Sequence, residues 1–249
     1  MGENILVIHG MRRGYQNEAL QRFIYRLMKE SGINFHITFL ESDINHLYNM
    51  ISSLVKQGVH EFNIVPLLLF SAKHYLQDIP TILQHLKNNY PYIEYQVTQP
   101  LGTHYHIVNI INERIKNALY VSPSISKIVF IAHGSERYKQ PNEQLKQVIN
   151  NCNVANKPIN MVMLYGDYSY KKRLPEILAE GGDILVVPVF LYDGFLVHKM
   201  KSEIQYMRNN SCIEFTKSLN FHPLLELIIK DQITQLEARN HVPDTTQFS

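Results

Sequence analysis

Residues 4–10 read NILVIHG, and residues 127–134 read KIVFIAHG. Each stretch is a short apolar run that ends in a His-Gly pair, at His9 and at His133. Two more matches follow in the same order and at similar offsets. IVPLLLFSA (64–72) is echoed by VVPVFLYDG (186–194), and PLGTHYHIVNII (100–111) is echoed by SLNFHPLLELII (218–229). Generic similarity between buried strands would explain the Val-Pro match alone, but not the two His-Gly strand ends. The chain is therefore predicted to be a tandem repeat of one structural unit.

Within the first repeat, apolar β-rich runs alternate with amphipathic helical patterns. The third apolar run has almost no polar residue, which is typical of a strand buried on both faces of a parallel sheet. We therefore predict an α/β fold of two similar lobes, each a four-stranded parallel sheet flanked by helices. The expected strands cover 5–8, 35–40, 62–70 and 93–97, and the expected helices cover 17–30, 44–56, 78–88 and 104–119.

The repeat also predicts the domain boundaries. Residues 1–120 should form the N-terminal lobe, and residues 127–237 the C-terminal lobe. Between them, VSPSIS (121–126) is small, polar and contains proline, which is typical of a connector. Residues 238–249, ARNHVPDTTQFS, are expected to be a polar tail.

The composition narrows the class of protein. Of 249 residues, 45% are hydrophobic and 18% are charged, as in ordinary globular proteins, and the net charge of +2 is too small to indicate nucleic-acid binding. Two scattered cysteines, Cys152 and Cys212, cannot supply a disulfide framework or a thiolate metal site. Neither a signal peptide nor an apolar run of about 20 residues is visible, so no membrane association and a cytoplasmic location are expected.

Three polar side chains follow the first three expected strands. His9 and Glu41 stand where strands one and two end, and His74 lies in the loop after strand three. Because ligands bind outside the carboxyl ends of parallel strands, these side chains should converge in one crevice. Taken singly, a histidine after a buried strand is more often structural and a glutamate there is more often a solvated charge. Their predicted convergence favours a functional site.

Two imidazoles and one carboxylate suit divalent metals such as iron, cobalt, nickel and zinc. A structural zinc site has four protein ligands, so a set of three is incomplete and allows a metal to be released. Glu41 or one of the histidines could also take up protons near neutral pH.

The motifs ILVIHGMRR, VPLLLFSAKHYLQDIP, PLGTHYHI, IAHGSERYKQPNEQL and VPVFLYDGFLVHKM together resemble the sirohydrochlorin chelatase family over about residues 4–235. The resemblance implies an ATP-independent enzyme that inserts a divalent metal into a tetrapyrrole in a cleft between two lobes. It implies metal-handling roles for His9 and His74, with Glu41 as their acidic partner. The metal would then be a substrate, and no permanently bound cofactor is expected.

The substrate that the resemblance implies, sirohydrochlorin, carries carboxylates around its rim, so cationic side chains should line the site. Arg12, Arg13 and Lys73 adjoin the expected metal ligands, and His133 is expected to help bind the tetrapyrrole from the second repeat. Met11 departs from the family, which commonly has serine after His-Gly.

Several functions stay open at this point. Fe²⁺ insertion, which gives sirohaem, is favoured, but ligand type does not separate iron from cobalt or nickel. A metal or tetrapyrrole carrier on the same fold is the alternative from another class, although a carrier needs no base. A porphyrin ferrochelatase shares the two-lobe architecture but matches the motifs at the strand ends less well.

Overall fold

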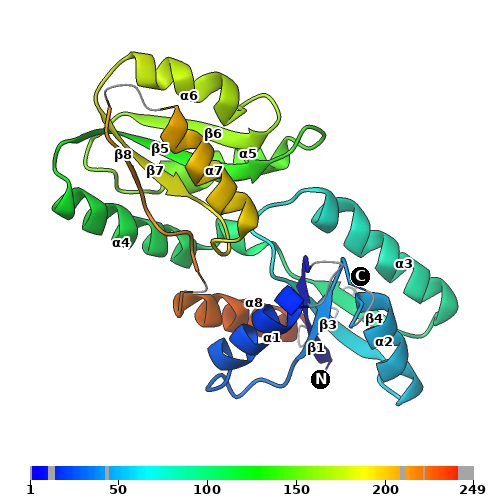
Figure 1. Cartoon of the computed structure of the whole chain (residues 1–249). Coiled ribbons are helices and arrows are strands. Elements are labelled where there is room, and N and C mark those ends of the chain that lie inside the picture. Colours follow the sequence, from blue (N-terminus) through cyan, green and yellow to red (C-terminus); the bar gives the residue numbers. More distant parts are fainter. Residues whose placement is uncertain (1, 11–14, 43–44, 208–210, 221, 241–249) are drawn as a thin grey trace, which may run out of the picture. The chain divides into compact units, whose positions relative to one another are not determined.

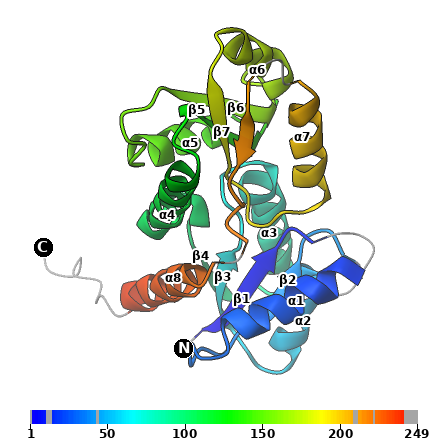
Figure 2. The ribbon, with the colours of Figure 1, turned by 60° about the vertical axis from the view of Figure 1, so that its left-hand side comes forward.

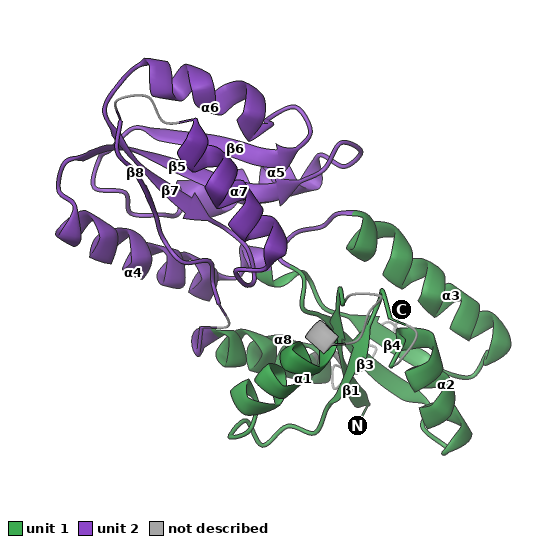
Figure 3. Ribbon diagram, viewed as in Figure 1, with its two compact units in different colours: residues 1–68, 73–101, 225–249 green, residues 69–72, 102–224 purple. Residues whose placement is uncertain are grey.

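The computed structural model describes residues 2–10, 15–42, 45–207, 211–220 and 222–240 (Figure 1). The chain forms two compact units (Figure 3). Unit 1 comprises residues 1–68, 73–101 and 225–249, and unit 2 comprises residues 69–72 and 102–224. No helix in the described ranges is both long enough and apolar enough to cross a membrane.

Unit 1 contains a parallel sheet with the strand order β2-β1-β3-β4. Helices α2 and α3 cover one face, where their apolar side chains pack against Ile5, Val7 and Ile64. Figures 1 and 2 show α1 and α8 on the opposite side of the sheet. The strands are β1 (Glu3–Ile8), β2 (His36–Phe39), β3 (Glu61–Pro66) and β4 (Glu94–Val97), and the helices are α1 (Tyr15–Leu27), α2 (Leu47–Lys56), α3 (Ile79–Asn89) and α8 (Leu224–Asn240).

Unit 2 repeats this design, with a parallel sheet in the order β6-β5-β7-β8. Helices α6 and α7 pack on one face, against Val129, Ile131 and Val186. Figure 2 shows α4 and α5 on the other side. The strands are β5 (Ile125–Gly134), β6 (Ile159–Tyr165), β7 (Asp183–Pro188) and β8 (Ile213–Phe215), and the helices are α4 (Tyr105–Val121), α5 (Gln140–Asn150), α6 (Tyr170–Ala179) and α7 (Phe195–Tyr206). The two identical strand orders confirm the predicted fold class.

The compact units do not follow the expected halves of the chain, because the last helix of each repeat is exchanged. Helix α4 ends the first repeat but belongs to unit 2, and α8 ends the second repeat but belongs almost entirely to unit 1. In unit 1, the buried amide of Gln232 on α8 donates a hydrogen bond to the Gln99 carbonyl (2.8 Å) and accepts one from Thr98 Oγ1 (3.2 Å). Helical periodicity reveals an apolar face but not which sheet that face covers.

Some boundaries differ from the sequence expectations. The strand expected at 62–70 ends at Pro66, because the chain then leaves the sheet and the carbonyls of Leu68 and Leu69 bond to the backbone of residues 101 and 102. The connector is shorter than 121–126, since α4 runs through Val121 and β5 begins at Ile125. Residues 238–240 of the expected tail are helical, and residues 241–249 lie outside the described ranges.

Candidate metal centre

His9 and Glu41 are placed at the carboxyl edge of unit 1 by the backbone. His9 directly follows β1, and the Glu41 N–H donates to the His9 carbonyl at 2.9 Å, which continues the pairing of β1 with β2. Gly10 has φ +74°, and a Cβ there would lie only 2.8 Å from that of Phe39, so glycine is needed at this turn. The Gly10 carbonyl accepts a hydrogen bond from His9 Nδ1 at 2.6 Å.

His74 opens a single π-helical turn, η1 (His74–Asp78), directly before α3. Its Nδ1 lies 2.7 Å from Asp78 Oδ2. Burial lowers the pKa of the His74 imidazole and the nearby His9 lowers it further, whereas the hydrogen bond and the charge of Asp78 act in the opposite direction. The net effect favours neutral His74, which is the form that binds metals.

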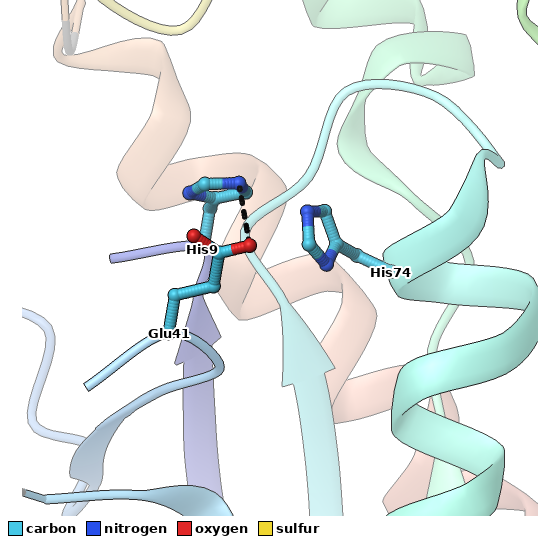
Figure 4. Close-up of side chains that lie close together, drawn as sticks. All are labelled: His9, Glu41 and His74. Atoms are coloured by element: carbon cyan, nitrogen blue, oxygen red, sulfur yellow. Dashed lines mark ion pairs between the residues drawn. The ribbon is translucent and has the colours of Figure 1, made fainter. Parts of the chain in front are cut away.

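The three side chains meet as the sequence pattern predicted (Figure 4). His9 Nε2 lies 3.9 Å from Glu41 Oε1, and the two imidazole rings are edge-to-face with centroids 4.3 Å apart. One ligand atom from each of His9, Glu41 and His74 lies within 4.8 Å of the other two. Within the described ranges, no other group of three or more histidine, cysteine or carboxylate side chains is arranged in this way.

Hydrogen bonds select the same tautomer for both histidines. A carbonyl or carboxylate oxygen cannot donate, so Nδ1 of His9 and Nδ1 of His74 carry the hydrogen. In the neutral rings, each Nε2 then keeps a free lone pair. Partners that fix the second ring nitrogen in this way are typical of metal-binding histidines. About half of the His9 side chain is exposed, so this cluster is open to solvent.

The remaining predicted residues lie in different places. Lys73 is exposed, and its Nζ is 3.7 Å from Asp78 Oδ1. His133 belongs to unit 2. Arg12 and Arg13, and likewise Met11, lie outside the described ranges.

The second repeat retains the histidine but not the cluster. His133 Nδ1 is 3.0 Å from the Gly134 carbonyl, as at His9. The position that corresponds to Glu41 holds Tyr165, which pairs with Gly134 in the sheet and whose ring centroid is 5.0 Å from that of His133. When the two repeats are aligned without gaps, Leu196 on α7 falls opposite His74, and His198 lies two residues later. An aromatic and an aliphatic side chain thus replace two potential ligands.

Sequence reasoning did not identify Asp78, the hydrogen-bond partner of His74. The signal was present, since a histidine and an aspartate four residues apart face each other on one side of a helix. It was overlooked because the helix was expected to begin at Asp78, with His74 in the preceding loop.

Two parallel sheets of one topology, with an incomplete set of metal ligands at the carboxyl edge of one of them, define a class of metal-handling α/β proteins. The CbiX family model matches residues 3–118 and again residues 127–236. The chain belongs to the CbiX family, and each repeat is one copy of its domain.

Known proteins of similar sequence and structure cover most of the chain. A sirohydrochlorin ferrochelatase of Priestia megaterium is 24% identical over 98% of this chain and 94% of its own length. A sirohydrochlorin cobaltochelatase of the same organism is 22% identical over 92% of this chain and 78% of its own length. The structure of SirB from Bacillus subtilis with Fe³⁺ superposes with a TM-score of 0.80 at 22% identity, covering 96% of this chain and 97% of SirB.

Proposed function

We propose that this protein inserts a divalent metal ion into sirohydrochlorin without ATP, with Fe²⁺ as the favoured metal and sirohaem as the product. The cluster of His9, Glu41 and His74 is the observation that supports this function most directly. Family membership and the names of the relatives point to the same reaction. The metal and the tetrapyrrole are both substrates.

The geometry suggests how the reaction proceeds. The two Nε2 lone pairs and the Glu41 carboxylate hold the incoming metal weakly, because three protein ligands leave the remaining positions to water or to the tetrapyrrole. As the metal enters the macrocycle, two pyrrole N–H protons must leave. Glu41 is the proposed acceptor, because its carboxylate lies beside the two imidazoles, with Oε1 3.9 Å from His9 Nε2, and a carboxylate in this place can act as a base.

The choice of metal is not set by the ligand types. Curated relatives include sirohydrochlorin ferrochelatases from two bacteria and a chloroplast, and one cobaltochelatase. Iron is therefore favoured, and cobalt or nickel insertion at the same site is the alternative. A carrier without catalytic activity is less well supported, because it would not need a carboxylate base. The cytoplasmic location and the roles of Arg12, Arg13, Lys73 and His133 in tetrapyrrole binding stay predictions.

An anaerobic absorbance assay tests this function. Purified protein is mixed with sirohydrochlorin and, in parallel, with Fe²⁺, Co²⁺ or Ni²⁺, and the rate without protein is subtracted for each metal. Acceleration that is lost in His74→Ala would support a chelatase and would rank its metals. Tight binding of sirohydrochlorin without acceleration by any metal would instead support the carrier.

A further inference from the structure

The segment that leads to His74 belongs to a different compact unit from His74 itself. Strand β3 is part of unit 1, residues 69–72 are part of unit 2, and the chain returns to unit 1 at Lys73. The metal-ligand candidate His74 is therefore the second residue after this return. Lys73 alone joins the segment 69–72 to the turn that begins at His74.

A glutamine from the second repeat holds this segment. Gln144, on α5, uses both ends of its amide on one residue, Ser71. Its Oε1 accepts from the Ser71 backbone N–H at 2.7 Å, and its Nε2 donates to Ser71 Oγ at 3.0 Å. Ser71 is buried, with 5% of its surface exposed, so these bonds satisfy polar groups that water reaches poorly.

A backbone contact holds the other end of the segment. The Gly102 N–H donates to the Leu69 carbonyl at 2.8 Å. A Cβ at position 102 would clash with that carbonyl, so only glycine permits this approach. Hydrogen bonds therefore hold both Leu69 and Ser71, and the backbone of residues 69–71 has little conformational freedom.

Only Ala72 and Lys73 separate Ser71 from His74, a step of at most about 10 Å even in an extended chain. Lys73 already has helical dihedrals, φ −47° and ψ −50°, and leads directly into η1. We propose that Gln144 is a positioning residue for His74 and acts through Ser71. This proposal rests on the metal role of His74 under the proposed function.

Co²⁺ binding to the full-length protein tests the proposal, because visible Co²⁺ absorption reports ligand number and geometry without sirohydrochlorin. Gln144→Leu should weaken Co²⁺ binding about tenfold and should alter the Co²⁺ spectrum. Loss of a residue that orients a metal ligand typically lowers metal affinity about 10- to 100-fold, and the smaller loss is expected here. Gln144→Glu should stay near wild type, since its carboxylate can accept from both the Ser71 N–H and its hydroxyl. Gln147→Leu, an exposed position on the same helix, is the matched control and should have no effect.

The decisive comparison adds Gln144→Leu to His74→Ala. If Gln144 acts through His74, the double variant should bind Co²⁺ no more weakly than His74→Ala alone. Two results would overturn the proposal. One is that Gln144→Leu lowers Co²⁺ affinity by the same factor in wild type and in His74→Ala, and the other is that the Co²⁺ spectrum of Gln144→Leu is that of wild type. Should Gln144→Leu not fold, Ser71→Ala serves instead, because it removes only the hydroxyl bond and should give a smaller loss of the same kind.

The two proposals can fail separately. Suppose that the wild-type protein binds Co²⁺ and that Gln144→Leu weakens this binding as expected, but that the wild type does not accelerate metal insertion. The chelatase function is then wrong, and the positioning role of Gln144 stands. If the wild type binds no Co²⁺ at all, the metal role of His74 and the positioning role of Gln144 are both overturned.

Discussion

His74 Nδ1 lies 2.7 Å from Asp78 Oδ2, across the single π-helical turn that directly precedes α3. With Nδ1 bonded to Asp78, the His74 ring presents its other nitrogen, Nε2, to His9 and Glu41 (Figure 4). Single π-helical turns are often found at functional sites. Here the turn gives the ring a fixed orientation and a fixed tautomer.

Replacing Asp78 should therefore impair metal handling. Asp78→Ala frees the His74 ring, and we expect Co²⁺ affinity and the insertion rate to fall about 10- to 100-fold. Lys73→Ala is the contrast, because it removes the ion pair on the same carboxylate but not the bond to the imidazole. It should raise the KM for sirohydrochlorin and leave Co²⁺ affinity unchanged. Unaltered Co²⁺ affinity in Asp78→Ala would contradict this account.

His9 and His133 form a natural pair for comparison. His9 directly follows β1, His133 lies at the end of the corresponding strand β5, and both have Nδ1 bonded to the carbonyl of the next glycine. Among the residues that the structure describes, only His9 of this pair has a second imidazole and a carboxylate beside it. His9→Ala should abolish measurable insertion and weaken Co²⁺ binding, whereas His133→Ala should leave Co²⁺ binding intact and affect only the KM for the tetrapyrrole. Equal loss of Co²⁺ binding in both variants would rule out this assignment.

Glu41→Gln removes the negative charge of the carboxylate in the metal cluster but keeps the size of the side chain. The amide is a poor base, so the insertion rate should drop by roughly 10²- to 10⁴-fold if Glu41 accepts the pyrrole protons. Co²⁺ affinity should fall less than in His9→Ala, since two imidazoles remain. The measurement is the insertion rate across pH 5.5–8.5. A wild-type rate throughout this range would remove Glu41 from the mechanism.

The sequence predicted much of this architecture for clear physical reasons. Strands buried on both faces are continuous apolar runs, and His9 and Glu41 immediately follow two of them, so their positions at the sheet edge could be inferred. The matching His-Gly and Val-Pro motifs predicted two sheets of one topology, which the strand orders confirm.

Other features depend on information that local patterns lack. The apolar run at 62–70 continues past Pro66, although residues 68–70 are only partly buried and lie outside the sheet, and composition does not distinguish them from strand residues. The exchange of α4 and α8 is likewise invisible, since a helix has the same apolar periodicity whichever sheet it covers. The bonds between Ser71 and Gln144 join residues far apart in the sequence, and no spacing rule predicts them.

The exchange of α8 makes a prediction about truncated chains. A chain that ends at Pro223 lacks the apolar side chains that α8 contributes to unit 1, among them Ile228, Ile229 and Ile233, each 2% exposed or less. Loss of one such side chain alone costs about 2–5 kcal/mol. Unit 1 should then lose its protection from hydrogen exchange, and Co²⁺ binding should disappear although all three ligands remain. A chain that ends at Asn240 is the control and should behave as the full protein.

Asp193 should make unit 2 sensitive to acid. Burial raises the pKa of its carboxyl, but hydrogen bonds from Asn220, Ser218 and Lys201 and the Lys201 charge outweigh this, so that the pKa is lowered overall. A carboxyl whose pKa is lower in the folded state contributes stability above its unfolded value of about 3.9, and this contribution is lost as the pH falls through the folded value.

The sign of this effect can be checked with Asp193→Asn. This variant should have a lower urea midpoint than wild type at pH 7, and the difference should shrink as the pH falls from 5 towards 3, where the wild-type carboxyl becomes protonated. Asp167→Asn, at an exposed aspartate, should leave the midpoint and its pH dependence unchanged. A constant difference between Asp193→Asn and wild type at every pH would mean that the loss arises from altered packing and not from the carboxylate charge.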